Sequence, residues 1–158
     1  MATNGRRLVV IAGAAPVPDE TFIARDLDAL RTCGWEMVCF GLAERFLSAP
    51  PPPGAPANAA LGLACLRRCL RLWRRPRQVL ALFRSRRLVR RVAAAARGTD
   101  LVLAQFAWLT ADIAAVAAEA AGVPWVCAVH AWDVFAQPPR LVRTRLAGAS
   151  RIIACSEA

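Results

Sequence analysis

The sequence has 158 residues, 57% of them apolar, which suits one domain with a buried core and excludes a disordered chain. Its formal net charge is +10, and every basic residue is an arginine. Of the 21 arginines, 12 lie between positions 61 and 99, where there is no acidic residue. The positive charge therefore belongs to one segment, and it predicts an anionic partner such as lipid headgroups or nucleic acid.

The N-terminal residues predict a strand, a helix and a second strand. The apolar run 8–12 is typical of a strand covered on both faces. Apolar residues then recur at helical spacing over 22–30, in a helix that Asp19 can cap and Gly34 can stop. The run 35–40 predicts the second strand, so this region is a βαβ unit of a parallel sheet. The first run is short for the core of a secretion signal.

A Pro- and Ala-rich loop, residues 48–60, precedes the arginine-rich segment 61–97, which predicts two amphipathic helices separated at Pro76. In the first helix, apolar residues that include Trp73 occupy one face and five arginines the other. These arginines are Arg67, Arg68, Arg71, Arg74 and Arg75. Such a separation is typical of a helix that lies on a membrane surface, and we expect these arginines and Trp73 to contact one.

Two alternatives for the arginine-rich segment stay open. It could be a solvated face, although 12 arginines without an acidic residue are excessive for one. It could also bind nucleic acid, but the sequence holds no binding-module signature and the residues between the arginines are mostly leucine. The sequence contains no apolar run of the roughly 18 residues that a membrane-spanning helix needs.

After Gly98 the alternation of strands and helices returns. Strands are predicted over 100–104, 124–129 and 151–154, and helices over 109–121 and 139–147. Five strands alternating with helices predict an α/β fold with a Rossmann-like parallel sheet and flanking helices. The six cysteines include no C-x-x-C pair, so neither a metal site nor a redox motif is predicted.

Ligands of an open parallel sheet bind beyond the carboxyl ends of its strands, and three loops qualify. The first runs from Gly13 to the next helix and offers backbone N–H groups to a phosphate or a sugar hydroxyl, although it lacks a G-x-G-x-x-G fingerprint. The second loop begins at Gln105, which could bind a polar ligand. The third holds His130, the single histidine, which can hydrogen-bond a hydroxyl. Asp133 could orient His130, cap the next segment or bind substrate. An ordinary structural role is the alternative for each residue.

Three stretches of the chain resemble retaining GT-B glycosyltransferases of family 4. The stretch PVPDETFIARDLDALRTCGWEMVCFGL is similar to the opening of those enzymes and matches them at Glu20 and Thr21. The stretch DLVLAQFAWLTADIAAVAAEAAGVPWVCAVHAWDVF matches at Phe106, His130 and Asp133, whereas Gln105 replaces a histidine of the family. The closing RIIACSEA is similar to the segment that precedes the crossover between the two GT-B domains.

The resemblance implies that residues 1–158 form the N-terminal, acceptor-side domain of such an enzyme, with 61–97 as a basic helical insertion. It implies transfer of a sugar from a nucleotide-sugar, the co-substrate, to a glycolipid or surface-polysaccharide acceptor with retention, without a metal or other cofactor. His130 would contact the donor sugar, with Asp133 as the second catalytic candidate. Gly13, Glu20, Thr21 and Gln105 would bind the donor or the acceptor.

The resemblance also implies a cytoplasmic enzyme that is peripheral on the inner face of the membrane. The C-terminal nucleotide-sugar domain is absent from these residues, so we expect the chain to be interrupted after Ala158 and to have no turnover by itself. The alternative function is a non-catalytic α/β module that docks to an anionic membrane or to RNA through its arginine-rich helices.

Overall fold

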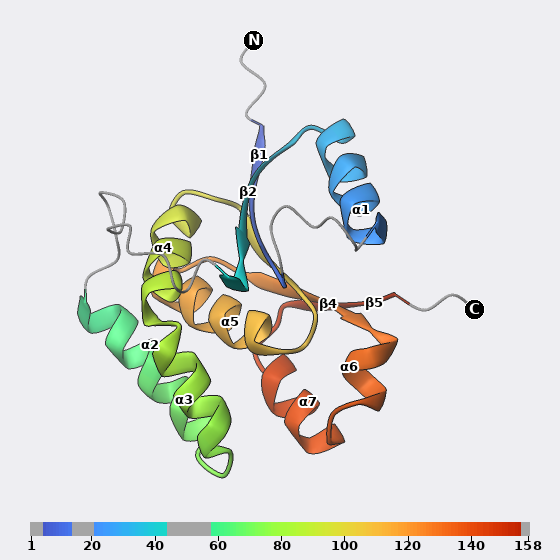
Figure 1. The fold of residues 1–158 in the computed structure, drawn as a ribbon. Coiled ribbons are helices and arrows are strands. Elements are labelled where there is room, and N and C mark those ends of the chain that lie inside the picture. Colours follow the sequence, from blue (N-terminus) through green and yellow to red (C-terminus); the bar gives the residue numbers. More distant parts are fainter. Residues whose placement is uncertain (1–4, 14–20, 44–57, 156–158) are drawn as a thin grey trace.

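The computed structural model describes residues 5–13, 21–43 and 58–155 of the chain. Within these ranges one to three helices lie between each strand and the next (Figure 1). The strands are β1 (Arg6–Ala12), β2 (Trp35–Gly41), β3 (Leu101–Gln105), β4 (Trp125–His130) and β5 (Arg151–Cys155). The helices are α1 (Thr21–Thr32), α2 (Asn58–Arg71), α3 (Pro76–Arg84), α4 (Arg86–Ala96), α5 (Leu109–Ala121), α6 (Ala131–Phe135) and α7 (Pro139–Leu146).

The strands form one parallel sheet in the order β2-β1-β3-β4-β5, which confirms the predicted α/β fold. In β1, Val9 pairs with Val38 of β2 and with Val102 of β3. The chain order reverses between β1 and β3, which is the point where open α/β sheets bind ligands. The predicted Rossmann-like sheet therefore brings the ends of β1, β3 and β4 to one edge.

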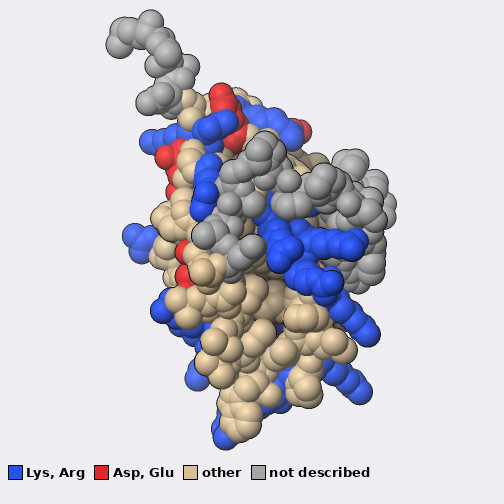
Figure 2. Space-filling model, turned by 90° about the vertical axis from the view of Figure 1, so that its left-hand side faces the viewer, with Lys and Arg blue, Asp and Glu red and all other residues tan. Residues whose placement is uncertain are grey.

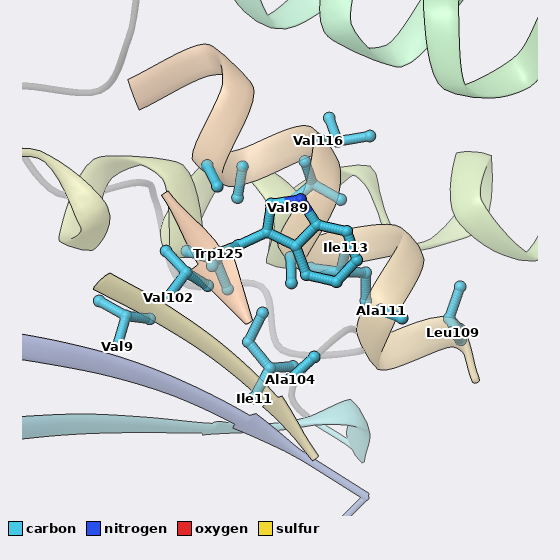
Figure 3. Close-up of a cluster of buried hydrophobic side chains, with 14 of the residues drawn as sticks. Val9, Ile11, Val89, Val102, Ala104, Leu109, Ala111, Ile113, Val116 and Trp125 are labelled. Atoms are coloured by element: carbon cyan, nitrogen blue, oxygen red, sulfur yellow. The ribbon is translucent and has the colours of Figure 1, made fainter. Parts of the chain in front are cut away.

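Helices cover both faces of the sheet. Val9 and Ile11 of β1 point to the face covered by α4 and α5, whereas Leu8 and Val10 point to the face covered by α1. This alternation follows from the period of two along a strand. Figure 3 shows the first of these cores, in which the indole of Trp125 lies among aliphatic side chains of the sheet and of the helices.

The basic insertion forms an outer layer on one side of the domain. Helix α2 packs against α5, and α3 packs against α5 and α4, so both lie outside the helices that cover the sheet (Figure 1). The prediction of one helix after Pro76 is wrong, because α3 and α4 are separated at Ser85. The Ser85 hydroxyl donates to the carbonyl oxygen of Ala81 at 2.9 Å, a local hydrogen bond that competes with continuous helix.

Several predicted boundaries are confirmed. Helix α5 has the predicted limits, and Gly122 ends it in the left-handed conformation with φ +73. Gly34 ends α1 in the same way with φ +84. The predicted cap at Asp19, most of the Pro-rich loop and Ser156–Ala158 lie outside the described residues. In the described part of the chain, no helix has the length and apolar character required to cross a membrane.

Candidate functional site

The ends of β3 and β4 bring together two of the predicted site residues. Gln105 ends β3 with 2% of its surface exposed, and half-buried His130 ends β4. The Nε2 atom of His130 lies 3.3 Å from Oε1 of Gln105. Because an amide oxygen accepts, Nε2 donates in this pair, and the imidazole is the Nε2–H tautomer. The sequence placed both residues at this edge, and the structure adds their direct contact.

Phe106 is a third member of this site that sequence reasoning gave no role. Its ring centroid lies 4.5 Å from that of His130. Its φ of +74 is the left-handed conformation, which costs a bulky residue about 1 kcal/mol or more. Its N–H donates to the Ala128 carbonyl at 2.9 Å, and the Thr110 hydroxyl lies 2.7 Å from its carbonyl oxygen. Its match to the family motif was the signal in the sequence.

Asp133 is buried beneath His130, with none of its surface exposed. Its Oδ2 accepts the His130 backbone N–H at 3.0 Å, and the His130 side chain accepts the Asp133 backbone N–H in return. The other carboxylate oxygen, Oδ1, has no hydrogen-bond partner within the described ranges. This burial fits the orienting and capping alternatives for Asp133 better than direct contact with a ligand. The expectation of a loop after β4 is wrong, because the short helix α6 follows His130 directly.

The remaining candidates come from the first loop. Gly13 follows β1 at the same edge of the sheet, where its carbonyl oxygen accepts the Leu42 N–H at 3.2 Å. Thr21 begins α1, and Glu20 lies outside the described residues. The structure thus shows Gly13 at the expected edge and leaves the ligand contacts of this loop as predictions.

The comparison with known families decides the identity of the domain. Residues 20–158 match the glycosyl transferase 4-like domain. The chain belongs to this family. Comparisons with curated proteins and with solved structures found no match. A glycosyl transferase 4-like domain takes part in binding a sugar donor or acceptor, which agrees with the family that the sequence motifs resemble.

A buried ionic cluster in this glycosyl transferase 4-like domain is connected by hydrogen bonds to the loop after β3. Asp112 of α5 is fully buried and lies between Arg68 of α2 and Arg145 of α7, which are 3% and 5% exposed. Arg68 donates to Asp112 Oδ1 through Nη2 at 2.7 Å and Nε at 2.9 Å, and Arg145 donates to Oδ2 through Nε at 3.1 Å. Burial lowers the pKa of Arg68, and the Asp112 carboxylate opposes that shift.

This cluster reaches the loop that holds Phe106. Arg145 donates to the carbonyl oxygen of Ala107 at 3.4 Å and also to Gln137 Oε1, while Gln137 donates to the same carbonyl at 3.1 Å. The cluster therefore fixes the residue next to Phe106. Sequence reasoning missed it, and the one acidic residue near the start of an Ala-rich helix, Asp112, was the signal that could have pointed to it.

The expected membrane contact of Arg68 is wrong, because this side chain turns inward to the Asp112 carboxylate. The other four predicted arginines are exposed. Arg67 pairs with Glu119 at 2.6 Å, and Arg71 donates to the carbonyl oxygen of Ala147 at 3.2 Å. Trp73 is 66% exposed, with the Arg74 guanidinium 4.9 Å from its ring centroid.

Proposed function

We propose that this domain is the acceptor-side wall of an enzyme that transfers a sugar from a nucleotide-sugar to a glycolipid or surface-polysaccharide acceptor with retention. In this reaction the bond from the anomeric carbon to the diphosphate breaks, and a bond to an acceptor hydroxyl forms as that hydroxyl loses its proton. The family match supports the reaction class. The observation that carries the choice of site is the convergence of Gln105, Phe106 and His130 at the edge where parallel sheets bind ligands.

His130 is the residue proposed to contact the donor sugar. Its Nε2–H faces Gln105 at 3.3 Å, a long hydrogen bond that a sugar hydroxyl can share or replace. Asp133 acts as a positioning residue, since its carboxylate holds the backbone of His130 rather than an exposed surface. Gly13 places backbone N–H groups near the diphosphate in this proposal. In this proposal the nucleotide is held by a second domain that faces this edge.

The proposal is tested by NMR on the ¹⁵N-labelled chain with a panel of nucleotide-sugars at millimolar concentration. Amide signals should shift for the residues around Gln105 and His130, and His130→Ala should abolish these shifts. Arg31→Ala is the control, because Arg31 is exposed on α1 and pairs with Asp28 of the same helix. The proposal fails if nucleotide-sugars perturb another face of the domain and leave this edge unchanged.

The second candidate function is a non-catalytic docking module. The large apolar side chains exposed on α2 and α3 favour it. A docking module would bind vesicles, and no nucleotide-sugar would shift the amide signals of residues at the ends of β3 and β4.

A further inference from the structure

We infer that a pocket between the α2–α3 turn and α7 binds the phosphate of an anionic lipid, whose chains lie against an apolar strip on α2 and α3. The inference rests on the proposed function in one respect. The proposed acceptor is carried on a membrane, and the inference states that the lipids of that membrane are anionic. The pocket has a volume of about 250 Å³. Its lining includes Leu72, Trp73, Leu141 and Thr144. It also includes four arginines, which are Arg71, Arg74, Arg75 and Arg140.

Within the described ranges of the chain, no carboxylate neutralises these four guanidinium groups. The lining of the pocket contains no acidic residue, and none of the four forms an ion pair with a carboxylate in the described part of the chain. Arg71 is anchored by the Ala147 carbonyl. Guanidinium groups gathered in this way repel one another and match the geometry of a phosphate, which accepts several charge-assisted hydrogen bonds.

Arg68 makes this pocket a built feature of the fold. While bound to Asp112, its guanidinium also donates to the Thr144 carbonyl at 3.2 Å and to the Arg145 carbonyl at 2.8 Å. It thereby joins α2, one turn before Arg71, to α7, the opposite wall of the pocket. The two walls are held together before any ligand binds, which lowers the entropy cost of binding.

An apolar strip adjoins the pocket at Trp73. It consists of six large apolar side chains on α2, the following turn and α3, each 47% to 66% exposed: Leu63, Leu66, Leu70, Trp73, Leu80 and Phe83. A groove of about 430 Å³ runs between Leu70, Trp73, Val79 and Phe83. Figure 2 shows this side of the molecule as an uncharged lower surface with basic residues along its borders. Such a surface requires an apolar partner with an anionic boundary.

A bilayer with anionic headgroups meets both requirements, because amphipathic helices bury leucine and tryptophan at the acyl boundary while arginines meet the phosphates. RNA suits this surface less, since the side chains between the arginines are mostly aliphatic and bind bases poorly. The α2–α3 turn also lies at the end of the molecule where α6 and α7 follow the carboxyl end of β4 (Figure 1).

The test is co-flotation of the 158-residue chain with vesicles of phosphatidylcholine, with or without about one third phosphatidylglycerol. The wild-type chain should float with the anionic vesicles only. The triple change Arg74→Gln, Arg75→Gln, Arg140→Gln should weaken partitioning about 100-fold, since each arginine lost from an anionic surface weakens binding roughly fivefold. A matched triple change of exposed arginines outside the pocket, Arg84→Gln, Arg87→Gln, Arg97→Gln, should weaken it far less.

The apolar strip is tested by Trp73→Ala against Trp132→Ala, a similarly exposed tryptophan on α6. Only Trp73→Ala should reduce flotation. The tryptophan fluorescence of the wild-type chain should shift to the blue when vesicles are added, and Trp73→Ala should abolish this shift. Circular dichroism of each variant checks that it is folded. His130→Ala should float like the wild type, so failure of the proposed catalytic site would leave this result intact.

Four results would overturn the inference. Equal losses of vesicle binding in the two triple variants would show that binding depends on the total positive charge and not on the pocket. Pyrophosphate binding that depends on the pocket arginines, without flotation, would make the pocket a site for a soluble phosphate compound. A concentration-dependent dimer abolished by Trp73→Ala would assign the strip to a second copy of the chain. RNA that binds while vesicles do not would assign the arginines to nucleic acid.

Discussion

Replacing Asp112 by asparagine should destabilise the fold more than any other single charge removal among the described residues. Asp112 carries the one negative charge between two buried arginines, and it accepts three hydrogen bonds from them. Asparagine keeps the shape and one acceptor oxygen but leaves both guanidinium groups without a counter-charge. Removing one partner of a buried ion pair costs about 3–5 kcal/mol, because the remaining charge stays desolvated.

That loss is a large part of the roughly 5–15 kcal/mol that stabilises an ordinary domain. For a chain of this size it corresponds to a fall in Tm of about 10 °C. Urea unfolding, followed by tryptophan fluorescence and circular dichroism, measures the free energy directly. Asp28→Asn is the matched control, since Asp28 is 71% exposed, pairs with Arg31 on the same helix, and should cost less than about 1 kcal/mol.

Apolar replacement of the whole cluster should rescue the fold. Replacing the cluster by apolar residues of similar volume, Arg68→Met, Asp112→Leu and Arg145→Met, removes the stranded charges and should recover most of the stability lost in Asp112→Asn. An Asp112→Asn variant within about 1 kcal/mol of the wild type would refute the reasoning. So would a triple variant less stable than the single one.

Two further predictions concern Cys127 and Asp133. Burial raises the pKa of the Cys127 thiol to about 12, so the folded chain keeps this proton above pH 9 while the unfolded chain loses it. The free energy of unfolding of the wild type, relative to that of Cys127→Ala, should therefore be constant below pH 9. It should fall by about 1.4 kcal/mol per pH unit as the pH rises towards 12. The sequence has no lysine or tyrosine to obscure this titration, and a difference that does not change with pH would contradict it. Asp133→Ala should cost about 1 kcal/mol and shift the backbone amide ¹⁵N signal of His130, because it removes the carboxylate that accepts the His130 backbone N–H. Unchanged histidine signals would leave Asp133 without a positioning role.

The strands and their order of appearance could be predicted because their signals are local. Runs such as 8–12 and 124–129 are apolar throughout, as buried parallel strands require, and glycines such as Gly122 end the helices by adopting a conformation that other residues avoid. The positions of Gln105 and His130 at one edge followed from the same local pattern, because parallel strands end on the same side of a sheet.

Helix α6 and the break at Ser85 could not be predicted in this way. Helix α6 begins with a reciprocal bond between His130 and Asp133, which is not the usual Ser/Thr and Glu/Gln pattern of a helix start. The break at Ser85 coincides with the hydrogen bond from its hydroxyl to the Ala81 carbonyl, and the pattern of apolar residues around it suits one continuous helix.

The sequence by itself determined the α/β class, the family and the residues at the edge of the sheet, because each depends on hydrophobic pattern or on motifs that are short in sequence. Only the tertiary structure decided what the arginines do. Helical spacing placed Arg68 beside Arg71 on one face, yet Arg68 is buried against Asp112, which is 44 residues away, while Arg71 lines an open pocket. Burial of a charge depends on a counter-charge that arrives from elsewhere in the fold, and no local pattern contains that information.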